Sequence, residues 1–315
     1  MVNHEPNGEE LDLALRVCEM YYNEGKTQEQ IAKEINVSRP RVSRILTFAK
    51  NAGLVTITIR DPRSGLEQLA NSLKTKYGLK DARVVATSSD PEVLKRRIGY
   101  SASQLLEECV DAAPNQVLGI GRGSTVYHTV QALPSSNKAR PLTVVPMVGG
   151  IGLYNPAFQV NEMARLAAER LGGDCIYFHA PYFVTTPEIK KAFLQDETIA
   201  QCISYWDRLD IALVGIGAIS FQDPLFTARV KNAQARSGRK IVADLCGRFL
   251  DKEGRVVREE PDVLLSIEME SLRKAKRVIA VAGGRGKEDS VKTAVIGGWV
   301  DVLVTDQWVA EAMCR

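Results

Sequence analysis

Three arginines within six positions carry the clearest chemistry in this 315-residue sequence. Arg39, Arg41 and Arg44 stand in the segment SRPRVSRIL, at residues 38–46. A guanidinium group can donate two parallel hydrogen bonds to guanine O6 and N7, and it also binds phosphate oxygens. Three of them on the outer face of one helix would form a surface suited to DNA.

The flanking residues predict two short helices joined by a tight turn. Thr27 is a typical N-cap residue, and the helix that it opens is expected over Thr27–Glu34. Asn36 suits the turn because asparagine tolerates left-handed backbone angles. Ser38 then caps a second helix, with Pro40 in the first turn, where a missing N–H costs nothing. This pattern indicates a helix-turn-helix, whose second helix enters the DNA major groove.

Apolar residues are spaced so that the two helices can pack while the arginines face outward. Ala32, Val37, Val42 and Ile45 would form the contact between them. The predicted DNA-contacting residues are Gln28, Ser38, Arg39, Pro40, Arg41, Ser43 and Arg44.

Charge along the first sixty residues supports this interpretation. Residues 1–34 hold eight acidic and three basic side chains, whereas residues 35–60 hold five basic side chains and no acidic one. The net charge of the whole chain is only +3, so any contact with DNA must be local. A basic helical hairpin with a merely solvated surface is the alternative.

Glycine clusters form a second group of candidate residues. They stand in QVLGIGRGSTV (116–126), VVPMVGGIG (144–152) and VIAVAGGRGK (278–287), each after a predicted strand. Backbone N–H groups at a helix start bind anions, which favours a phosphate or polyhydroxyl ligand. The first cluster is GxGxG rather than GxGxxG, and the third lacks the first glycine of a Walker A motif. NAD and ATP are therefore not expected, and no cofactor is predicted.

Polar side chains near these clusters could complete a pocket. Asp244 and Glu268 offer carboxylates that accept hydrogen bonds from sugar hydroxyls, and Arg248 or Lys287 could pair with a phosphate. Each could equally be a helix cap or a member of a surface ion pair. Other polar candidates flank the start of the helix expected at 160–171; they are Asn155, Gln159, Asn161 and Glu162.

Hydrophobic periodicity predicts two domains. A helix over Leu11–Asn23, with Leu11, Leu15, Cys18 and Tyr22 on its apolar stripe, would pack beneath the helix-turn-helix. Gly53 is expected to end the second helix, followed by a strand over residues 54–59. We expect a DNA-binding domain at 1–60, a linker at 61–66 and a second domain at 67–315.

The second domain alternates between strand and helix patterns. This alternation predicts an α/β fold with an open, doubly wound, largely parallel sheet, and ligands on such sheets bind at the carboxyl ends of the strands. Expected strands are 82–86, 116–120, 142–146, 174–178, 211–215, 239–242, 278–282 and 302–305. Expected helices are 66–77, 91–109, 125–133, 160–171, 187–194 and 291–297.

Composition excludes several other classes of protein. Hydrophobic residues make up 45% of the chain, and no run approaches the 18 apolar residues of a membrane span. The polar, acidic N-terminus does not resemble a signal peptide, so a cytoplasmic location is expected. Six scattered cysteines and three histidines show no metal-ligand spacing, so we expect buried reduced thiols and no metal site.

Motifs along nearly the whole chain resemble the SorC family of bacterial transcriptional regulators. They include YYNEGKTQEQIAKEINVSRPRVSRIL, GIGRGSTV, NEMARLAAERLGG, ADLCGRFLDKEG and SIEMESLRKAKRVIAVAGGRGK. The resemblance implies a non-catalytic C-terminal domain that binds a sugar or sugar phosphate and has the fold of sugar-phosphate isomerases. It also implies homodimers or homotetramers on operator DNA. The effector residues that it implies are Gly121, Gly123, Ser124, Thr125, Gly149, Gly150, Gln159, Asp244, Glu268 and Lys287.

One position departs from a branch of the family in which a lysine directly before the Gly-Gly pair forms a Schiff base with the sugar. Val148 stands there in this chain, which does not favour a covalent effector. The sequence thus predicts an effector-controlled DNA-binding regulator that is not an enzyme. The alternatives are a sugar-phosphate isomerase or deaminase with a DNA-binding appendage, and an architectural DNA-binding protein that responds to no small molecule.

Overall fold

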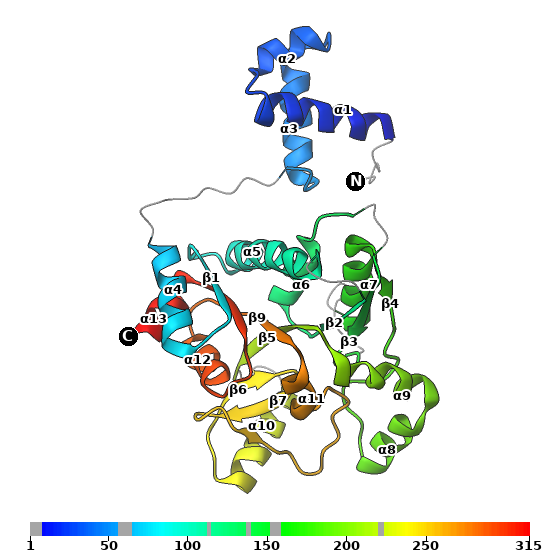
Figure 1. Ribbon diagram of the computed structural model, residues 1–315, viewed down its shortest axis with the longest axis vertical. Coiled ribbons are helices and arrows are strands. Elements are labelled where there is room, and N and C mark those ends of the chain that lie inside the picture. The colour runs from blue at the N-terminus through cyan, green and yellow to red at the C-terminus, as the bar shows by residue number, and fades with distance from the viewer. Residues whose placement is uncertain (1–7, 56–64, 112–114, 137–139, 152–158, 220–223) are drawn as a thin grey trace. The chain divides into compact units, whose positions relative to one another are not determined.

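The chain forms two compact units, Met1–Arg63 and Ser64–Arg315, in a computed structural model (Figure 1). The structure describes residues 8–55, 65–111, 115–136, 140–151, 159–219 and 224–315. Each unit has its own hydrophobic core.

The first unit is a small helical domain. Its elements are α1 (Gly8–Cys18), the π-helical turn η1 (Glu19–Asn23), α2 (Gln28–Glu34) and α3 (Arg39–Asn51). Ile31 and Ala32 of α2 and Val42 and Leu46 of α3 are buried between these helices. Val37 and Ile45 pack at the edge of the same cluster, as the apolar spacing predicts.

The apolar stripe expected on the first helix is wrong at Leu15, although Tyr22 packs against the core as predicted. Ala14 and Val17 are buried in the core, whereas Leu15 is 46% exposed. Cys18 is buried and belongs to both possible stripes. Both stripes fit a 3.6-residue period, and the buried one carries the smaller side chains of Ala14, Val17 and Cys18. The face of α1 that carries the large side chain of Leu15 is therefore not the buried one.

Local capping chemistry sets the helix boundaries of this unit. Thr27 and Gln30 form a reciprocal capping box, with Gln30 N donating to Thr27 Oγ1 (3.3 Å) and Thr27 N donating to Gln30 Oε1 (2.9 Å). Asn36 has the left-handed φ of 54° that the turn requires. Ser38 is the N-cap residue of α3, although its side chain makes no capping hydrogen bond. Gly53, with φ 73°, follows the end of α3. The strand expected at 54–59 falls mostly outside the described residues.

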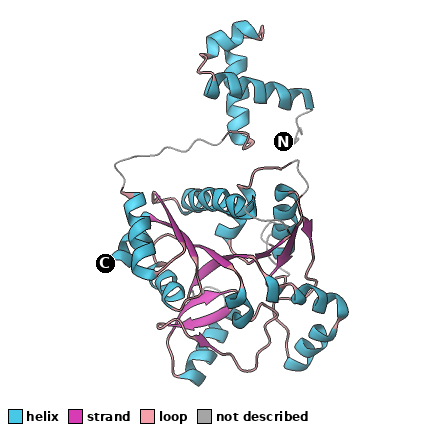
Figure 2. Ribbon diagram, viewed as in Figure 1, coloured by secondary structure: helices cyan, strands magenta, loops and turns pink. Residues whose placement is uncertain are grey.

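The second unit is built on a mostly parallel sheet, whose strands are magenta in Figure 2. The strand order is β1-β10-β9-β5-β2-β3-β4. These strands are β1 (Asp81–Val85), β2 (Gln116–Ile120), β3 (Leu142–Pro146), β4 (Asp174–Cys175), β5 (Ile211–Ala218), β9 (Arg277–Val281) and β10 (Val302–Asp306). An antiparallel extension continues from the end of β5. It consists of β6 (Ile241–Leu245), β7 (Arg248–Asp251) and β8 (Val256–Val257).

Helices connect the strands, and most of them pack against the sheet (Figure 2). They are α4 (Leu66–Tyr77), α5 (Pro91–Asp111), α6 (Ser124–Gln131), α7 (Val160–Leu171), α8 (Pro187–Gln195), α9 (Glu197–Ser204), η3 (Trp206–Arg208), α10 (Pro224–Ser237), α11 (Met269–Lys274), α12 (Glu288–Ile296) and α13 (Gln307–Cys314). The predicted α/β fold class is confirmed. All six cysteines are free thiols, four of them buried. Within the described residues, no helix is both long and apolar enough to cross a membrane.

Candidate functional site

The outer face of α3 carries the predicted DNA-contacting side chains. Arg39, Arg41 and Arg44 are exposed, and so is Ser43. Val42, on the opposite face, is buried. None of the three arginines forms an ion pair with a described acidic residue, so their guanidinium groups are available to an external anion. The remaining predicted contacts are the exposed Ser38 and Pro40 and the half-buried Gln28, which begins α2.

A second candidate site lies where β2, β5 and β9 end, because parallel strands bring their carboxyl ends to one edge of the sheet. Gly121 N, after β2, donates to Leu213 O of β5 (2.8 Å). Lys287 Nζ, after β9, donates to Ile216 O of β5 (2.8 Å). Gly217 of β5 is paired in register with Asp244 of β6. The structure therefore brings Gly121, Asp244 and Lys287 into one cluster.

Asp244 is the acidic centre of this cluster. Its Oδ1 atom is enclosed and accepts no hydrogen bond from any described residue. Burial raises the pKa of the carboxyl group above its ordinary value, and the positive charges of Arg122, Arg229 and Lys287 oppose this rise. An enclosed carboxylate oxygen without a donor is costly in the free protein and is ready to accept a hydrogen bond from a ligand hydroxyl.

Lys287 supplies a positive charge next to that carboxylate. Burial lowers the pKa of its ammonium group, and the charge of Asp244 opposes this shift. The α6 helix begins nearby at Ser124, and the first N–H groups of a helix have no partner within it. The cluster of Asp244, Lys287 and the Gly123–Thr125 helix start thus offers acceptors for hydroxyls and donors for anionic oxygens.

Arg229 belongs to this cluster, and the sequence did not reveal it. Its guanidinium lies 4.6 Å and 4.9 Å from the ring centroids of Phe183 and Phe249. Arg229 Nε donates to Glu259 (2.8 Å) and Nη2 donates to Gly247 O (2.9 Å), while the enclosed Nη1 atom has no acceptor among the residues that the structure describes. Helix α10, which carries Arg229, was not predicted, and Glu259 lies 30 residues away, so no local pattern could have indicated this pair.

Gly149 and Gly150 have backbone partners of their own. Gly149 N donates to Leu265 O (2.9 Å) and Gly150 N donates to Ala180 O (2.9 Å). The side-chain amide of Gln159 bonds both backbone groups of Ile151. These three predicted effector residues thus hold neighbouring segments together in the free protein.

The two glycines are expected to tolerate alanine very differently. A Cβ atom on Gly149 would lie 2.3 Å from Pro181 O, whereas one on Gly150 would make only ordinary contacts with Gln159 Oε1 at 3.5 Å and Ala180 O at 3.9 Å. Overpacking typically costs about 1–3 kcal/mol, so Gly149→Ala should lower the free energy of unfolding by at least that amount. Gly150→Ala, as the matched control, should change it little. Urea unfolding of both variants measures the difference, and equal stabilities would contradict this assignment.

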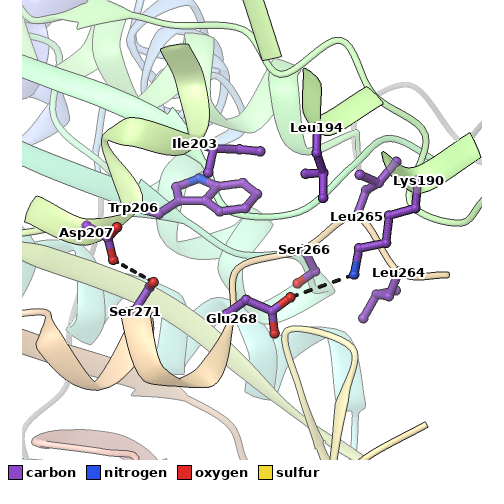
Figure 3. Close-up of a pocket in the computed structure, with 10 residues that line it drawn as sticks. All are labelled: Lys190, Leu194, Ile203, Trp206, Asp207, Leu264, Leu265, Ser266, Glu268 and Ser271. Atoms are coloured by element: carbon purple, nitrogen blue, oxygen red, sulfur yellow. Dashed lines mark hydrogen bonds and ion pairs between the residues drawn. The ribbon is translucent and has the colours of Figure 1, made fainter. Parts of the chain in front are cut away.

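Glu268 lines a pocket of about 200 Å³ between α8, α9 and α11 (Figure 3). Its Oε1 atom accepts a hydrogen bond from Arg248 Nη2 (2.6 Å) and lies 3.8 Å from Lys190 Nζ. Asp262 completes this ion-pair network, 2.8 Å from Lys190 and 3.0 Å from Arg248. Among the described residues, the ion-pair partners of Glu268 are these two cations, and its role as an effector contact stays a prediction.

Comparison with known proteins places this geometry in a family. Residues 61–315 match the Sugar-bind family, described as "Putative sugar-binding domain", and residues 15–51 match region 4 of sigma-70. The sorbitol operon regulator of Klebsiella pneumoniae is 30% identical, over 98% of this chain and 99% of its own length. The chain belongs to the SorC family. The Bacillus subtilis deoxyribonucleoside regulator is 29% identical, over 97% of this chain and 98% of its own length.

Solved structures of the SorC family agree with this assignment. The full-length sorbitol operon regulator SorC of Klebsiella pneumoniae superposes with a TM-score of 0.79, covering 98% of this chain and all of that one. The sor operon regulator of Shigella flexneri covers 80% of this chain with a TM-score of 0.73 and 31% identity. These relatives are transcriptional regulators and not enzymes. The chain is therefore a DNA-binding transcriptional regulator with a sugar-binding domain, and the isomerase or deaminase alternative is not supported.

Proposed function

We propose that this SorC-family regulator controls an operon of sugar or polyol metabolism, and that a sugar, polyol or sugar phosphate bound beside Asp244 and Lys287 sets its affinity for the operator. The observation that carries this proposal is the enclosed Asp244 Oδ1, which has no hydrogen-bond partner in the described part of the chain, next to the partly buried ammonium group of Lys287. Such a pair suits a ligand with both hydroxyls and anionic oxygens. Relatives named for sorbitol and for deoxyribonucleosides point to the same class of compound.

The DNA-binding half of the proposal rests on α3. Its exposed arginines would bind guanine edges and phosphates in the major groove, with Ser38 and Gln28 at the margins of the contact. One chain supplies one recognition helix, whereas helix-turn-helix proteins usually read two half-sites one helical turn apart. We therefore propose a homodimer or homotetramer, which acts in the cytoplasm, where its operator is accessible. Light scattering of the purified chain tests the assembly.

Thermal unfolding of the full chain against a compound panel tests the effector. Sorbitol, sorbitol 6-phosphate, fructose 6-phosphate, ribose 5-phosphate and deoxyribose 5-phosphate cover the proposed class. A compound present at a hundred times its Kd should stabilise the folded protein by about 2.7 kcal/mol, which is a readily measured shift in Tm. We expect a shift with one chemical group of compounds and not with the rest. A panel that leaves the Tm unchanged throughout would contradict the proposed effector class.

The compound that shifts the Tm then permits a test of regulation. By linkage, the compound must change the Kd for the operator by the same factor by which operator binding changes the Kd for the compound. Operator duplexes selected by the protein from a random pool serve for this titration. An effector that binds tightly but leaves the operator Kd unchanged would contradict control by this site.

A further inference from the structure

Asp306 connects the glycine loop that carries Lys287 to the last helix of the chain. This carboxylate is fully buried at the end of β10. Its Oδ1 atom accepts a hydrogen bond from Gly284 N (2.9 Å), and its Oδ2 atom accepts one from Trp308 N (3.2 Å) in the first turn of α13. One rigidly held side chain thus bonds both the loop at 283–287 and the start of α13.

Side chains tie the same two segments together from outside. The guanidinium of Arg285, in the middle of the loop, lies 4.3 Å from the ring centroid of Trp308. The indole N–H of Trp308 donates to Glu288, which begins α12 directly after Lys287. The residues on either side of Lys287 therefore contact the first turn of α13 independently of Asp306.

The other end of α13 is held by α4. Tyr77 Oη donates to Met313 O (2.7 Å), and Lys76 Nζ donates to Met313 O (2.9 Å) and Cys314 O (3.1 Å). The last carbonyl groups of a helix have no partner within it, so these donors satisfy the end of α13. The positive charge of Lys76 also complements the helix dipole there. Helices α4 and α13 lie side by side (Figure 1).

Helix α4 is the first described element of the second unit. It begins at Leu66, three residues after Arg63, the last residue of the DNA-binding unit. Helix α13 has eight residues, about 12 Å of length, and therefore spans from the Lys287 loop to the helix that continues the chain from the DNA-binding unit.

We propose that α13 couples the Lys287 loop to α4, with Asp306 as the positioning residue at one end and Tyr77 at the other. The regulatory use of this coupling rests on the proposed function, in which the effector binds beside Lys287. A ligand that replaces Ile216 O as the hydrogen-bond acceptor of the Lys287 ammonium changes the conformation of the loop at 283–287. This is the loop that Asp306 and Arg285 contact. Helix α13 then passes this change to α4 and to the covalent connection with the DNA-binding unit.

Hydrogen exchange of the full-length chain, without ligand or DNA, tests the coupling. Tyr77→Phe removes one hydrogen bond and keeps the ring. One hydrogen bond, worth about 1 kcal/mol, corresponds to about fivefold faster exchange in α13. We expect the amides of the loop, from Gly284 to Lys287, to exchange at least about twofold faster as well. In the reverse direction, Asp306→Asn should speed exchange in α4.

Thr186→Ala is the matched control, since it removes the N-cap hydrogen bond of α8 elsewhere in the same unit. It should speed exchange in α8 and leave the Lys287 loop unchanged. Loop amides that exchange at the wild-type rate in Tyr77→Phe, or that respond equally to Thr186→Ala, would overturn the proposal. Because the measurement uses no effector, its failure would leave the proposed function intact. A failed compound panel would likewise leave the exchange result valid.

Discussion

Replacing Arg39, Arg41 and Arg44 together with alanine is expected to weaken operator binding at least about 100-fold at constant salt. A single arginine that binds a base edge contributes about 1–3 kcal/mol, and 1.4 kcal/mol is a tenfold change in affinity. All three side chains are exposed, and none pairs with a described acidic residue, so their loss should leave the core of the unit unchanged. Fluorescence anisotropy with a selected operator duplex measures the loss, and circular dichroism verifies that the helices are retained.

A charge-matched control separates recognition from net charge. Lys231, Lys252 and Arg258 are exposed residues of the second unit, and their replacement by alanine also removes three positive charges. This variant should bind the operator within about threefold of wild type, because it removes no contact from the major groove. Equal losses in the two triple variants would show that α3 is not the recognition helix.

Single lysine replacements at the same positions distinguish base contacts from phosphate contacts. A lysine keeps the positive charge but loses the two-pronged donor geometry of arginine. A base-contacting arginine should therefore lose specificity at one base pair when it is replaced, whereas a phosphate-contacting arginine should mainly alter the dependence of affinity on salt.

The elements that the sequence predicted well are those with local causes. The Thr27–Gln30 capping box and the left-handed Asn36 turn depend on side chains within four residues of each other. The strands at 116–120 and 142–146 are short apolar runs bounded by turn residues, and their observed ends match the predicted ones. Helices 66–77 and 160–171 likewise end at glycines with left-handed φ angles.

The features that the sequence did not predict depend on contacts between distant segments. The choice between Leu15 and Val17 for the buried face of α1 is made by α3, and not by α1 itself. Arg229 enters the candidate site only because α10 packs over the antiparallel extension. Gly149 and Glu268, which the sequence predicts as effector contacts, also have partners within the protein, Leu265 O and Arg248. Spacing along the chain cannot show whether such a group already has a partner.

Asp244 and Asp262 are two aspartates of the second unit whose pKa values are shifted in opposite directions, although the sequence does not distinguish them. Burial raises the pKa of Asp244 against the opposing cations. Burial acts in the same direction on Asp262, but the hydrogen bond from Lys190 and the charge of Arg248 outweigh it, and its pKa is lowered. The first carboxylate therefore costs stability in the free protein, and the second contributes stability. A residue that destabilises the free protein is a candidate for ligand binding.

Asp244→Asn is accordingly expected to raise the stability of the free protein while it weakens effector binding about 10- to 100-fold. Asparagine has the same shape but carries no charge, so the cost of enclosing the carboxylate disappears. A gain of about 1 kcal/mol would raise the Tm by roughly 2–4 °C in a domain of this size. The effector loses a hydrogen bond to a charged acceptor, worth about 1.5–3 kcal/mol. Thermal unfolding with and without the active panel compound measures both changes.

The pH dependence of stability provides an independent check. Because the pKa of Asp244 is higher in the folded protein than in the unfolded chain, the folded protein binds this proton more tightly. The contribution of Asp244 to stability therefore falls as the pH rises from its unfolded pKa through its folded pKa, and the penalty is complete above the latter. Asp244→Asn should remove this component. Asp262→Asn should instead lower the Tm above the unfolded pKa of Asp262 and leave the effector shift in place, because the ion pairs of that carboxylate are with Lys190 and Arg248 and not with Lys287. If Asp244→Asn lowers the Tm and preserves the effector shift, Asp244 is a structural residue, and the effector binds elsewhere.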